Sequence, residues 1–305
     1  MKIAILLATY MGEKYIAEQL DSILGQSYED WKIYVHDDGS RDRTLEIIEE
    51  YREKNPDKIE IIDAPSTRGA RNNFLFLMSQ VEAPFYMCCD QDDFWLPTKI
   101  EKTVEAMERL EEEGADKPHL VFTDLTVVDS NLKVMAERMS KYQNLDCKNT
   151  KLSRILMQNV VTGCTMMMNR KLRDMAIQYK DRENIIMHDW WAGIIAANFG
   201  AMYFVDEPTI LYRQHGDNSV GALDIKSFPY VMKKLEDPHA MRTSVSKAQK
   251  QAQELVDTFG LAADSLPGKF ASAADMSKLE RLKLYKENDF KKTGLARNIG
   301  LKIWG

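Results

Sequence analysis

The sequence predicts a doubly wound α/β sheet that is followed by a helical region. Short apolar segments alternate with amphipathic helical segments over residues 1–100, which is typical of parallel strands covered by helices on both faces. Beyond residue 222 no strand pattern remains, and polar helical segments alternate with prolines. We therefore expect a sheet domain over residues 1–222, with halves at 1–100 and 101–222, and a helical appendage over residues 223–305.

The predicted strands are short apolar segments that end in polar or turn-forming residues. The first, residues 3–8, is wholly apolar, as expected of a strand buried on both faces. A hairpin is predicted around Asp129, Ser130 and Asn131. The remaining strands are expected at residues 31–35, 58–62, 85–89, 119–124, 165–168 and 201–205, and residues 208–212 lead into the polar segment 213–219.

The predicted helices have apolar residues three or four positions apart, which places these residues on one face. In the second helix, Leu45 and Ile48 are expected to face the core, with Asp42 as the N-terminal cap. Pro97 suits the first position of the helix predicted up to residue 113. The other helices are expected near residues 16–24, 72–80, 152–157 and 185–198.

The composition limits the class of protein. With 44% hydrophobic residues, the chain can bury a sizeable core, which excludes general disorder. The net charge of −6 argues against nucleic acid as a partner. Cys88, Cys89, Cys147 and Cys164 show no CxxC spacing and are expected to be reduced thiols of a cytoplasmic protein. The first apolar segment is too short for a signal peptide, and no segment approaches the ~20 apolar residues that span a bilayer.

Three polar clusters follow strands of the predicted parallel sheet, where ligands of such sheets bind. They are Thr9-Tyr10, Asp37-Asp38 and the run from Asp90 to Asp93. The sequence contains neither a GxGxxG fingerprint nor a GxxxxGK[ST] loop, which argues against a dinucleotide site and a P-loop.

The carboxylates of Asp90, Asp92 and Asp93 repel one another unless a cation or water compensates them. Mg²⁺ or Mn²⁺ suits such oxygen ligands and commonly shares them with substrate phosphates. A solvated acidic loop is the alternative interpretation. Likewise, Asp37 and Asp38 can accept hydrogen bonds from a nucleoside, or they can simply shape a turn.

Taken together, the motifs resemble those of family 2 glycosyltransferases with the GT-A fold, and the resemblance covers about 220 residues. The motifs are Ala8-Thr9-Tyr10, the run VHDDGSRD from Val35 to Asp42, and the run DQDDFWLP from Asp90 to Pro97. The segments CDQDDFWLP, MHDWW and YRQHGDNSVGA look most similar to those of bacterial rhamnosyltransferases.

The resemblance implies roles for individual residues on the donor side. Asp92 would be the direct ligand of Mg²⁺ or Mn²⁺, with His215 as a further metal or diphosphate ligand. Arg71 lies in the loop after the third strand, from which it could reach the diphosphate, and a plain solvated loop is the alternative. The implied nucleotide-binding residues are Ala8, Thr9, Tyr10, Asp37, Asp38, Asp90 and Gln91.

On the acceptor side, Asp189 would be the catalytic base, and His188 replaces the acidic residue that precedes it in the family. The aromatic neighbours and the helix N-terminus act in opposite directions on the pKa of Asp189, so no net shift is predicted. Helix capping is the alternative role for Asp189, and burial in the core is the alternative for the tryptophans. The other residues expected near the sugar or acceptor are Asp93, Trp95, Trp190, Trp191 and Arg213, and support of the acidic loop is the alternative role for Asp93.

The C-terminal region combines apolar residues with positive charge. Residues 278–302 contain eight Lys/Arg and three Asp/Glu, a local charge of +5, which leaves −11 for the remainder of the chain. Such a segment can lie on the inner face of the cell membrane as a peripheral contact. The alternatives are a solvated helix packed on its own domain and a contact between two copies in a homodimer.

The function expected from these observations is an inverting, metal-dependent glycosyltransferase. It would transfer a sugar, L-rhamnose from dTDP-rhamnose, to a cell-surface glycan or a lipid-linked saccharide. One alternative is a donor such as UDP-galactose or UDP-glucose. A sugar-1-phosphate nucleotidyltransferase is less consistent, because the turn at residues 9–14 lacks the Gly-rich basic loop. A non-catalytic nucleotide-sugar-binding or assembly protein is the remaining alternative.

Overall fold

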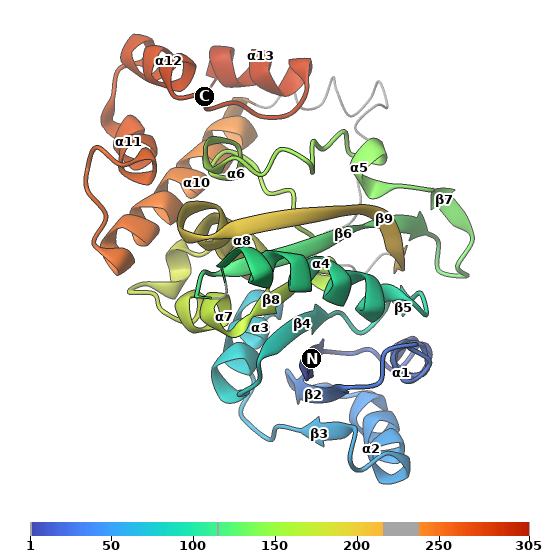
Figure 1. The fold of residues 1–305 in the computed structure, drawn as a ribbon. Helices are drawn as coiled ribbons and strands as arrows, with labels where there is room; N and C mark the ends of the chain where they lie inside the picture. Colours follow the sequence, from blue (N-terminus) through green and yellow to red (C-terminus); the bar gives the residue numbers. More distant parts are fainter. Residues whose placement is uncertain (1, 115, 216–237, 305) are drawn as a thin grey trace.

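The computed structural model describes residues 2–114, 116–215 and 238–304. Its centre is one nine-stranded mixed sheet with helices on both faces (Figure 1). The strands are β1 (Ile3–Thr9), β2 (Trp31–Asp37), β3 (Ile59–Ile61), β4 (Phe85–Cys89), β5 (Phe94–Trp95), β6 (His119–Val128), β7 (Val134–Ala136), β8 (Met167–Asn169) and β9 (Ala201–Arg213).

The helices connect and cover these strands. Those before the last strand are α1 (Ile16–Leu24), α2 (Thr44–Lys54), α3 (Ala70–Gln80), α4 (Lys99–Gly114), α5 (Met139–Tyr142), α6 (Leu152–Ile155), α7 (Arg170–Ala176) and α8 (His188–Phe199). The C-terminal helices are α10 (Pro238–Phe259), α11 (Leu266–Ser272), α12 (Lys278–Glu287) and α13 (Leu295–Trp304).

The strand order is β3-β2-β1-β4-β8-β6-β9-β5, and β7 pairs with β6 outside this path. The first four strands in this order are parallel, which follows from the βαβ connections that cross over between them. β8 is antiparallel to both β4 and β6, whereas β6 and β9 are parallel. The carboxyl ends of β1, β2 and β4 therefore meet at one edge of the sheet.

Alternate residues of the central strands face two separate cores. Leu6 of β1 faces the core formed with α3, α7 and α8, whereas Ile5 and Leu7 face the core formed with α1, α2 and α4. All three side chains are fully buried. This two-sided burial explains why the first strand is wholly apolar.

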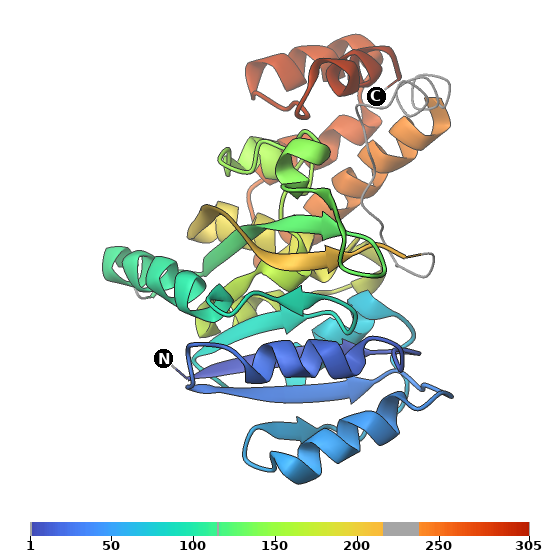
Figure 2. The same ribbon diagram turned by 90° about the vertical axis from the view of Figure 1, so that its right-hand side faces the viewer.

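The C-terminal helices extend one of these cores. Val245, Ala252 and Leu255 of α10 are buried in the same cluster as Trp191 and Ile194 of α8. Figure 2 shows α10 packed against the α8 side of the sheet domain, with the later helices beyond it. The boundary predicted near residue 222, together with Asn218 and the rest of the HGDNSVGA run after His215, lies outside the described residues.

Most predicted elements are present, with differences at particular residues. Leu45 is 41% exposed, and the prediction that it faces the core is wrong, since α2 begins at Thr44 and buries Thr44 and Ile48, one turn apart. The strand predicted at 201–205 is longer than expected and continues through residues 208–212 as part of β9. Its pairing with β6 shifts register where Pro208 lacks an N–H for the ladder.

Several predicted helix starts also differ: α8 begins at His188, three residues after the predicted start, and α3 begins at Ala70, two residues before it. Asp42 precedes the N-cap of α2, Arg43, although its carboxylate still accepts a hydrogen bond from Thr44 N at 3.1 Å. Pro97 lies in the turn before α4 and is not its first residue. All four cysteines are buried free thiols. Within the described ranges, no helix is both long enough and apolar enough to cross a bilayer.

Candidate active site at the carboxyl ends of the parallel strands

A cleft of about 1570 Å³ opens at the carboxyl ends of β1, β2 and β4. The polar clusters meet there because Thr9 pairs in register with Asp37, and β4 ends beside β1. The strand ends therefore share one edge of the sheet, as the sequence predicts. The predicted site residues that line the cleft are Ala8, Thr9, Tyr10, Asp38, Asp90, Gln91, Asp92, His188, Asp189, Trp190 and His215.

Gln91 connects the loops that follow β1 and β4. Its Oε1 accepts a hydrogen bond from Tyr10 N at 2.8 Å, and its Nε2 donates to Tyr10 O at 2.8 Å. A Cβ atom on Gly12 would lie 2.3 Å from Gln91 Oε1, so this contact requires glycine at position 12. With its backbone held in this way, the Tyr10 side chain stays 60% exposed at the cleft.

The two aspartates after β2 have different surroundings. The Asp37 carboxylate accepts hydrogen bonds from Ser40 N at 2.6 Å and Ser40 Oγ at 2.7 Å, which shapes the turn, and it does not line the cleft. Asp38 lines the cleft and accepts hydrogen bonds from the loop at residues 66–69, including Gly69 N at 2.6 Å. Burial raises the pKa of Asp38, but these hydrogen bonds outweigh burial and hold it below its usual value.

The acidic loop after β4 presents its carboxylates in three environments. Asp92 Oδ2 lies 2.8 Å from His215 Nε2, and both side chains line the cleft. Burial raises the pKa of Asp90 to about 7, and repulsion from Asp92 and Asp189 adds to this shift. Asp93 is fully buried, and burial raises its pKa well above the usual value. Asp93 therefore lies behind the surface that a ligand would contact.

Arg213 is buried behind this acidic loop and does not line the cleft. It is 2% exposed, and its Nε donates a hydrogen bond to the carbonyl oxygen of Asp92 at 2.9 Å. Its Nη2 forms an ion pair with Glu18 at 2.5 Å, and the guanidinium lies 4.5 Å from the ring centroid of Tyr15. Arg213 thus fixes the backbone that carries Asp92.

Lys99 places a buried positive charge behind the acidic loop. Its side chain is fully buried, and its Nζ lies 3.8 Å from the centroid of the Trp95 ring. Burial lowers the pKa of Lys99 to about 8, and nearby groups that include Cys164 and Asp93 oppose this shift. Trp95 is itself fully buried and lies outside the cleft lining.

Two groups of residues could bind a cation. Asp90, Asp93 and Cys164 bring their side-chain ligand atoms within 4.8 Å of one another. Two of these three are fully buried, and the Lys99 ammonium interacts with both, which opposes a second cation there. The pair of Asp92 and His215 opens into the cleft and offers a carboxylate and an imidazole. This pair therefore fits a divalent cation that also binds a substrate phosphate.

Asp189 also lines the cleft and lies at the start of α8. The N-cap of α8 is Met187, so Asp189 is not the cap. Burial raises the pKa of Asp189 to about 6. Hydrogen bonds from Trp190 N at 2.5 Å, from Gly163 N and from Asn159 Nδ2 at 3.1 Å limit this rise. The sequence predicts no net shift in the pKa of Asp189, because two effects oppose each other. In the structure burial is the larger effect.

His188 packs beside Asp189 as a neutral imidazole. It is 3% exposed and stacks on Phe74, with ring centroids 4.1 Å apart. Burial lowers the pKa of His188 to about 3, and neither ring nitrogen has a hydrogen-bond partner within the described part of the chain. A Cβ atom on Gly163 would lie 2.7 Å from Nε2, so glycine leaves room for this ring.

The remaining predicted residues divide between cleft and core. Trp190 lines the cleft, whereas Trp191 is fully buried and donates a hydrogen bond to Ala176 O at 2.9 Å. Arg71 donates to Ile185 O at 2.8 Å and pairs with Glu183, so its side chain points along the segment before α8 and does not line the cleft.

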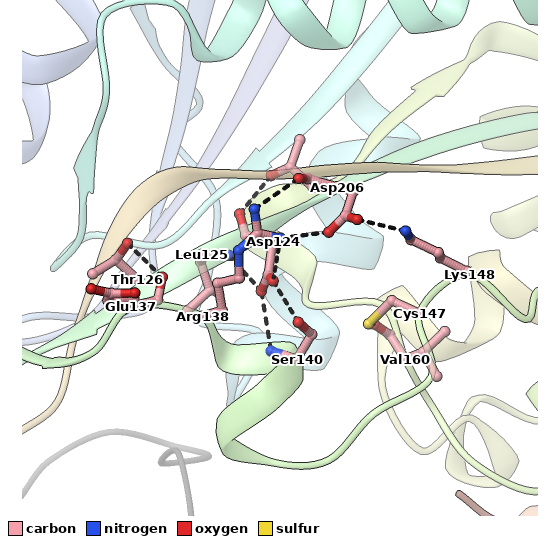
Figure 3. A network of polar contacts seen from close by, with 11 residues as sticks. Asp124, Leu125, Thr126, Glu137, Arg138, Ser140, Cys147, Lys148, Val160 and Asp206 are labelled. Atoms are coloured by element: carbon pink, nitrogen blue, oxygen red, sulfur yellow. Dashed lines mark hydrogen bonds and ion pairs between the residues drawn. The ribbon is translucent and has the colours of Figure 1, made fainter.

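A polar network supports the wall that carries α5 (Figure 3). The buried carboxylate of Asp124, on β6, accepts hydrogen bonds from Ser140 N at 3.1 Å and Ser140 Oγ at 2.5 Å. Arg138 links it to Asp206 of β9, with which it forms an ion pair at 2.5 Å, and Lys148 pairs with Asp206 at 2.6 Å. The network therefore ties the segment after β7 to the sheet.

Several residues of the site carry no motif that would reveal them in the sequence. Asn159 and Gly163 contact Asp189 from a segment without a recognisable sequence pattern. Glu18 and Lys99 lie on amphipathic helices, and nothing in the sequences of these helices distinguishes the two residues. Gly163 offers the only local signal, because an isolated glycine before a strand often marks a close approach of other atoms.

A cleft at the carboxyl ends of parallel strands, lined by an acidic loop and by the further carboxylate of Asp189, is typical of enzymes that act on nucleotides. The chain belongs to glycosyl transferase family 2, whose family model matches residues 4–174. It is 33% identical over 230 residues to the dTDP-rhamnosyl transferase RfbG of Shigella flexneri, across 71% of this chain and 74% of that protein. The chain is therefore a glycosyltransferase, as the motifs predict.

Solved structures show the same fold. TarS 1–349 from S. aureus superposes with a TM-score of 0.54 at 19% identity, covering 95% of this chain and 88% of TarS 1–349. The mannosyltransferase PcManGT from Pyrobaculum calidifontis, in complex with GDP-Man and Mn²⁺, gives a TM-score of 0.51 at 14% identity, covering 99% and 86% of the two chains. The GT-A fold with C-terminal helices is thus confirmed.

Proposed function

We propose that this glycosyltransferase transfers a sugar, with inversion and with the help of a divalent cation, from a nucleoside diphosphate to an acceptor hydroxyl group. The observation that carries this proposal is that Asp189 and the Asp92–His215 pair line the same cleft. The cleft therefore offers both a base and ligands for a cation beside a diphosphate, which are the two requirements of the reaction.

Asp189 is suited to the role of general base. With its pKa raised to about 6, the carboxylate is ionised at neutral pH and is still basic enough to take a proton efficiently. It accepts the proton of the acceptor hydroxyl while that oxygen bonds to the anomeric carbon. The bond from this carbon to the diphosphate oxygen breaks on the opposite face, which inverts the anomeric configuration.

Asp92 and His215 would hold Mg²⁺ or Mn²⁺, which when bound stabilises the negative charge of the leaving diphosphate as a Lewis acid. Tyr10, which is exposed at the cleft, would stack on the base, and Asp38 and Asp90 would lie beside the nucleoside. Trp190 would contact the sugar or the acceptor. In this arrangement Arg213 is a positioning residue, because it contacts the backbone of Asp92.

For the donor we propose dTDP-L-rhamnose and, for the acceptor, a cell-surface glycan or a lipid-linked saccharide. The similarity to the Shigella flexneri dTDP-rhamnosyl transferase, at 33% identity across most of both chains, supports this donor. The alternative donors are UDP-galactose and UDP-glucose. A non-catalytic nucleotide-sugar-binding protein would instead keep its affinity for the nucleotide after Asp189→Asn and show no turnover.

The experiment that tests this proposal compares the wild type with Asp92→Asn. Thermal stabilisation and donor hydrolysis are measured with dTDP-rhamnose, UDP-galactose and UDP-glucose, in the presence and absence of Mn²⁺. The control is Asp57→Asn, which makes the same chemical change at an exposed site outside the cleft.

We expect Mn²⁺-dependent stabilisation and hydrolysis with dTDP-rhamnose, both lost in Asp92→Asn and unchanged in Asp57→Asn. A preference for a UDP-sugar would retain the reaction and replace the donor. A wild-type protein that responds to no nucleotide sugar in the presence of Mn²⁺ or Mg²⁺ would overturn the proposed site.

A further inference from the structure

Helices α12 and α13 form one end of the molecule. Figures 1 and 2 show them side by side, at the end of the molecule that lies farthest from β3. Lys278, at the start of α12, donates a hydrogen bond from Nζ to the carbonyl oxygen of Ile303, near the end of α13, at 2.8 Å. The two helices therefore present a joint surface.

This surface exposes large apolar side chains in an ordered pattern. On α13, Leu295, Ile299 and Ile303 are spaced by four residues and are 78%, 40% and 44% exposed, so they form one outward stripe. On the same helix Leu301 is only 4% exposed and faces the core. Leu279 of α12 is 82% exposed. Large apolar side chains that are exposed in such a row indicate a surface that binds a partner.

The charge around the stripe identifies the kind of partner. Lys283 and Lys286 share a face of α12 with Leu279, and Lys302 lies between Ile299 and Ile303 on α13. Residues 278–302 carry +5 in a chain of −6. A second copy that met this surface through a two-fold axis would bring these exposed lysines close to those of the first copy, which is repulsive. An anionic lipid surface is complementary both to the charge and to the stripe.

The same surface is connected to the cleft. Arg297 of α13 donates hydrogen bonds to Gln143 O at 2.9 Å and Asn144 O at 3.0 Å, and Gln143 lines the cleft. Just before α13, Thr293 N donates to Gln158 Oε1 at 2.8 Å, next to the cleft residue Asn159. The segment that carries the stripe therefore contacts the part of the chain that includes the cleft residues Gln143 and Asn159.

We propose that α12 and α13 bind the surface of a membrane rich in anionic lipid, with the stripe in the headgroup region and the lysines at the phosphates. Because the docked segment also holds the wall beside Asp189, the acceptor is a saccharide carried on a membrane lipid. This second clause rests on the proposed glycosyl transfer, whereas the membrane binding itself does not.

The test measures co-sedimentation of the full chain with vesicles of phosphatidylcholine alone and of phosphatidylcholine with about one third phosphatidylglycerol. One variant, Leu295→Glu/Ile299→Glu, removes the stripe, and a second, Lys283→Glu/Lys286→Glu/Lys302→Glu, reverses the charge. Their controls are Val134→Glu/Met135→Glu and Lys54→Glu/Arg109→Glu/Lys171→Glu, which make the same changes at exposed residues elsewhere. Hydrolysis of the soluble donor is measured for every variant, so that loss of the active site is distinguished from loss of membrane binding.

We expect the wild type to sediment with the anionic vesicles and much less with phosphatidylcholine alone, and added salt to weaken this binding. The charge reversal should weaken it by about a hundredfold or more, because each lysine near such a surface contributes about a fivefold factor. Both control variants should bind as the wild type does. Absence of wild-type binding, or binding that survives both variants, would overturn the proposal. So would a wild-type dimer that becomes a monomer in Leu295→Glu/Ile299→Glu, because a second copy would then be the partner.

Discussion

Asp189 owes its chemistry to its surroundings. Burial raises its pKa to about 6, and the protonated form cannot accept a proton from the acceptor. We therefore expect kcat/KM to increase with pH through about 6 and to level off above it, since this parameter reports the free enzyme. Asp189→Asn should lower kcat by about 10²–10⁴-fold at neutral pH.

The pH profile of the wild type, measured with saturating metal at each pH, checks this expectation. Asp189→Glu is the matched variant, because it keeps a carboxylate and should retain part of the activity with the same acidic limb. An Asp189→Asn variant with wild-type turnover would exclude Asp189 as the base. So would a wild-type profile with no inflection near pH 6.

Gly163 is expected to control the position of both His188 and Asp189. Gly163→Ala would place a Cβ atom 2.7 Å from His188 Nε2, which forces the ring or the backbone to move. A displacement of this size beside the proposed base Asp189 should lower kcat by about 10–100-fold. Gly193→Ala on α8 is the control, because its nearest contact would be an ordinary 3.6 Å, and its kcat should stay that of the wild type. Equal kcat values for the two variants would contradict this interpretation.

For individual residues, the sequence predicts which residues gather near the cleft. It predicts less well whether each of them lines the cleft or supports it from behind. Asp92 and Asp189 line the cleft as expected, whereas Arg213 and Trp95 belong to the support behind it. The difference lies in burial, which depends on the register of β9 and on the packing of α4, and a local motif does not encode either. Asn159 reaches Asp189 from a segment without any pattern, so only the fold reveals it.

Among the elements, β6 and its polar network determine how firmly the α5 wall is held. Asp124→Ala would remove the buried carboxylate that accepts hydrogen bonds from the part-buried N–H and hydroxyl of Ser140, together with the charge opposite Arg138. We expect the free energy of unfolding to fall by about 2–4 kcal/mol, measured by urea denaturation. Asp206→Ala is the control. Asp206 is 45% exposed, so its ion pairs should contribute at most about 1 kcal/mol.

If Asp124→Ala and Asp206→Ala lower the free energy of unfolding by the same amount, the hydrogen bonds of the Asp124 carboxylate are not what stabilises this part of the fold. Proteolysis near α5 offers a second readout. The Asp124→Ala variant should be cleaved there faster than the Asp206→Ala variant, because the first loses the contacts that fix Ser140 to the sheet.

The elements themselves were largely predictable, for a physical reason. Strands such as β1 and β4 are buried on both faces, so their composition alone distinguishes them. The exceptions are positions at which contacts between distant segments determine the local structure. β5, which has only two residues, exists because it pairs with β9, and Leu45 faces solvent because the start of α2 sets which residues share its inner face.

For the whole molecule, the question is whether the C-terminal helices are an appendage or a part of the catalytic domain. Glu254 of α10 is 2% exposed, and its carboxylate accepts hydrogen bonds from Lys180 N at 2.5 Å, Asp181 N at 3.0 Å and Asn184 Nδ2 at 3.1 Å. These groups belong to the segment that leads directly to His188 and Asp189. α10 therefore holds the polypeptide that positions the proposed base, and its apolar face belongs to the core of α8.

Glu254→Ala tests this connection. Three donors would lose the buried carboxylate that accepts from them, so we expect the free energy of unfolding to fall by about 1–3 kcal/mol and kcat to fall as the segment before α8 loosens. The exposed neighbour Gln253→Ala should change stability by no more than about 0.5 kcal/mol. Hydrogen exchange of β1 and β4 amides, followed together with that of α10, shows how far the effect extends. If the helices and the sheet unfold as one unit, both sets of amides lose protection equally in Glu254→Ala. If residues 223–305 were an independent appendage, the amides of β1 and β4 would keep their wild-type protection, and donor hydrolysis would survive the substitution.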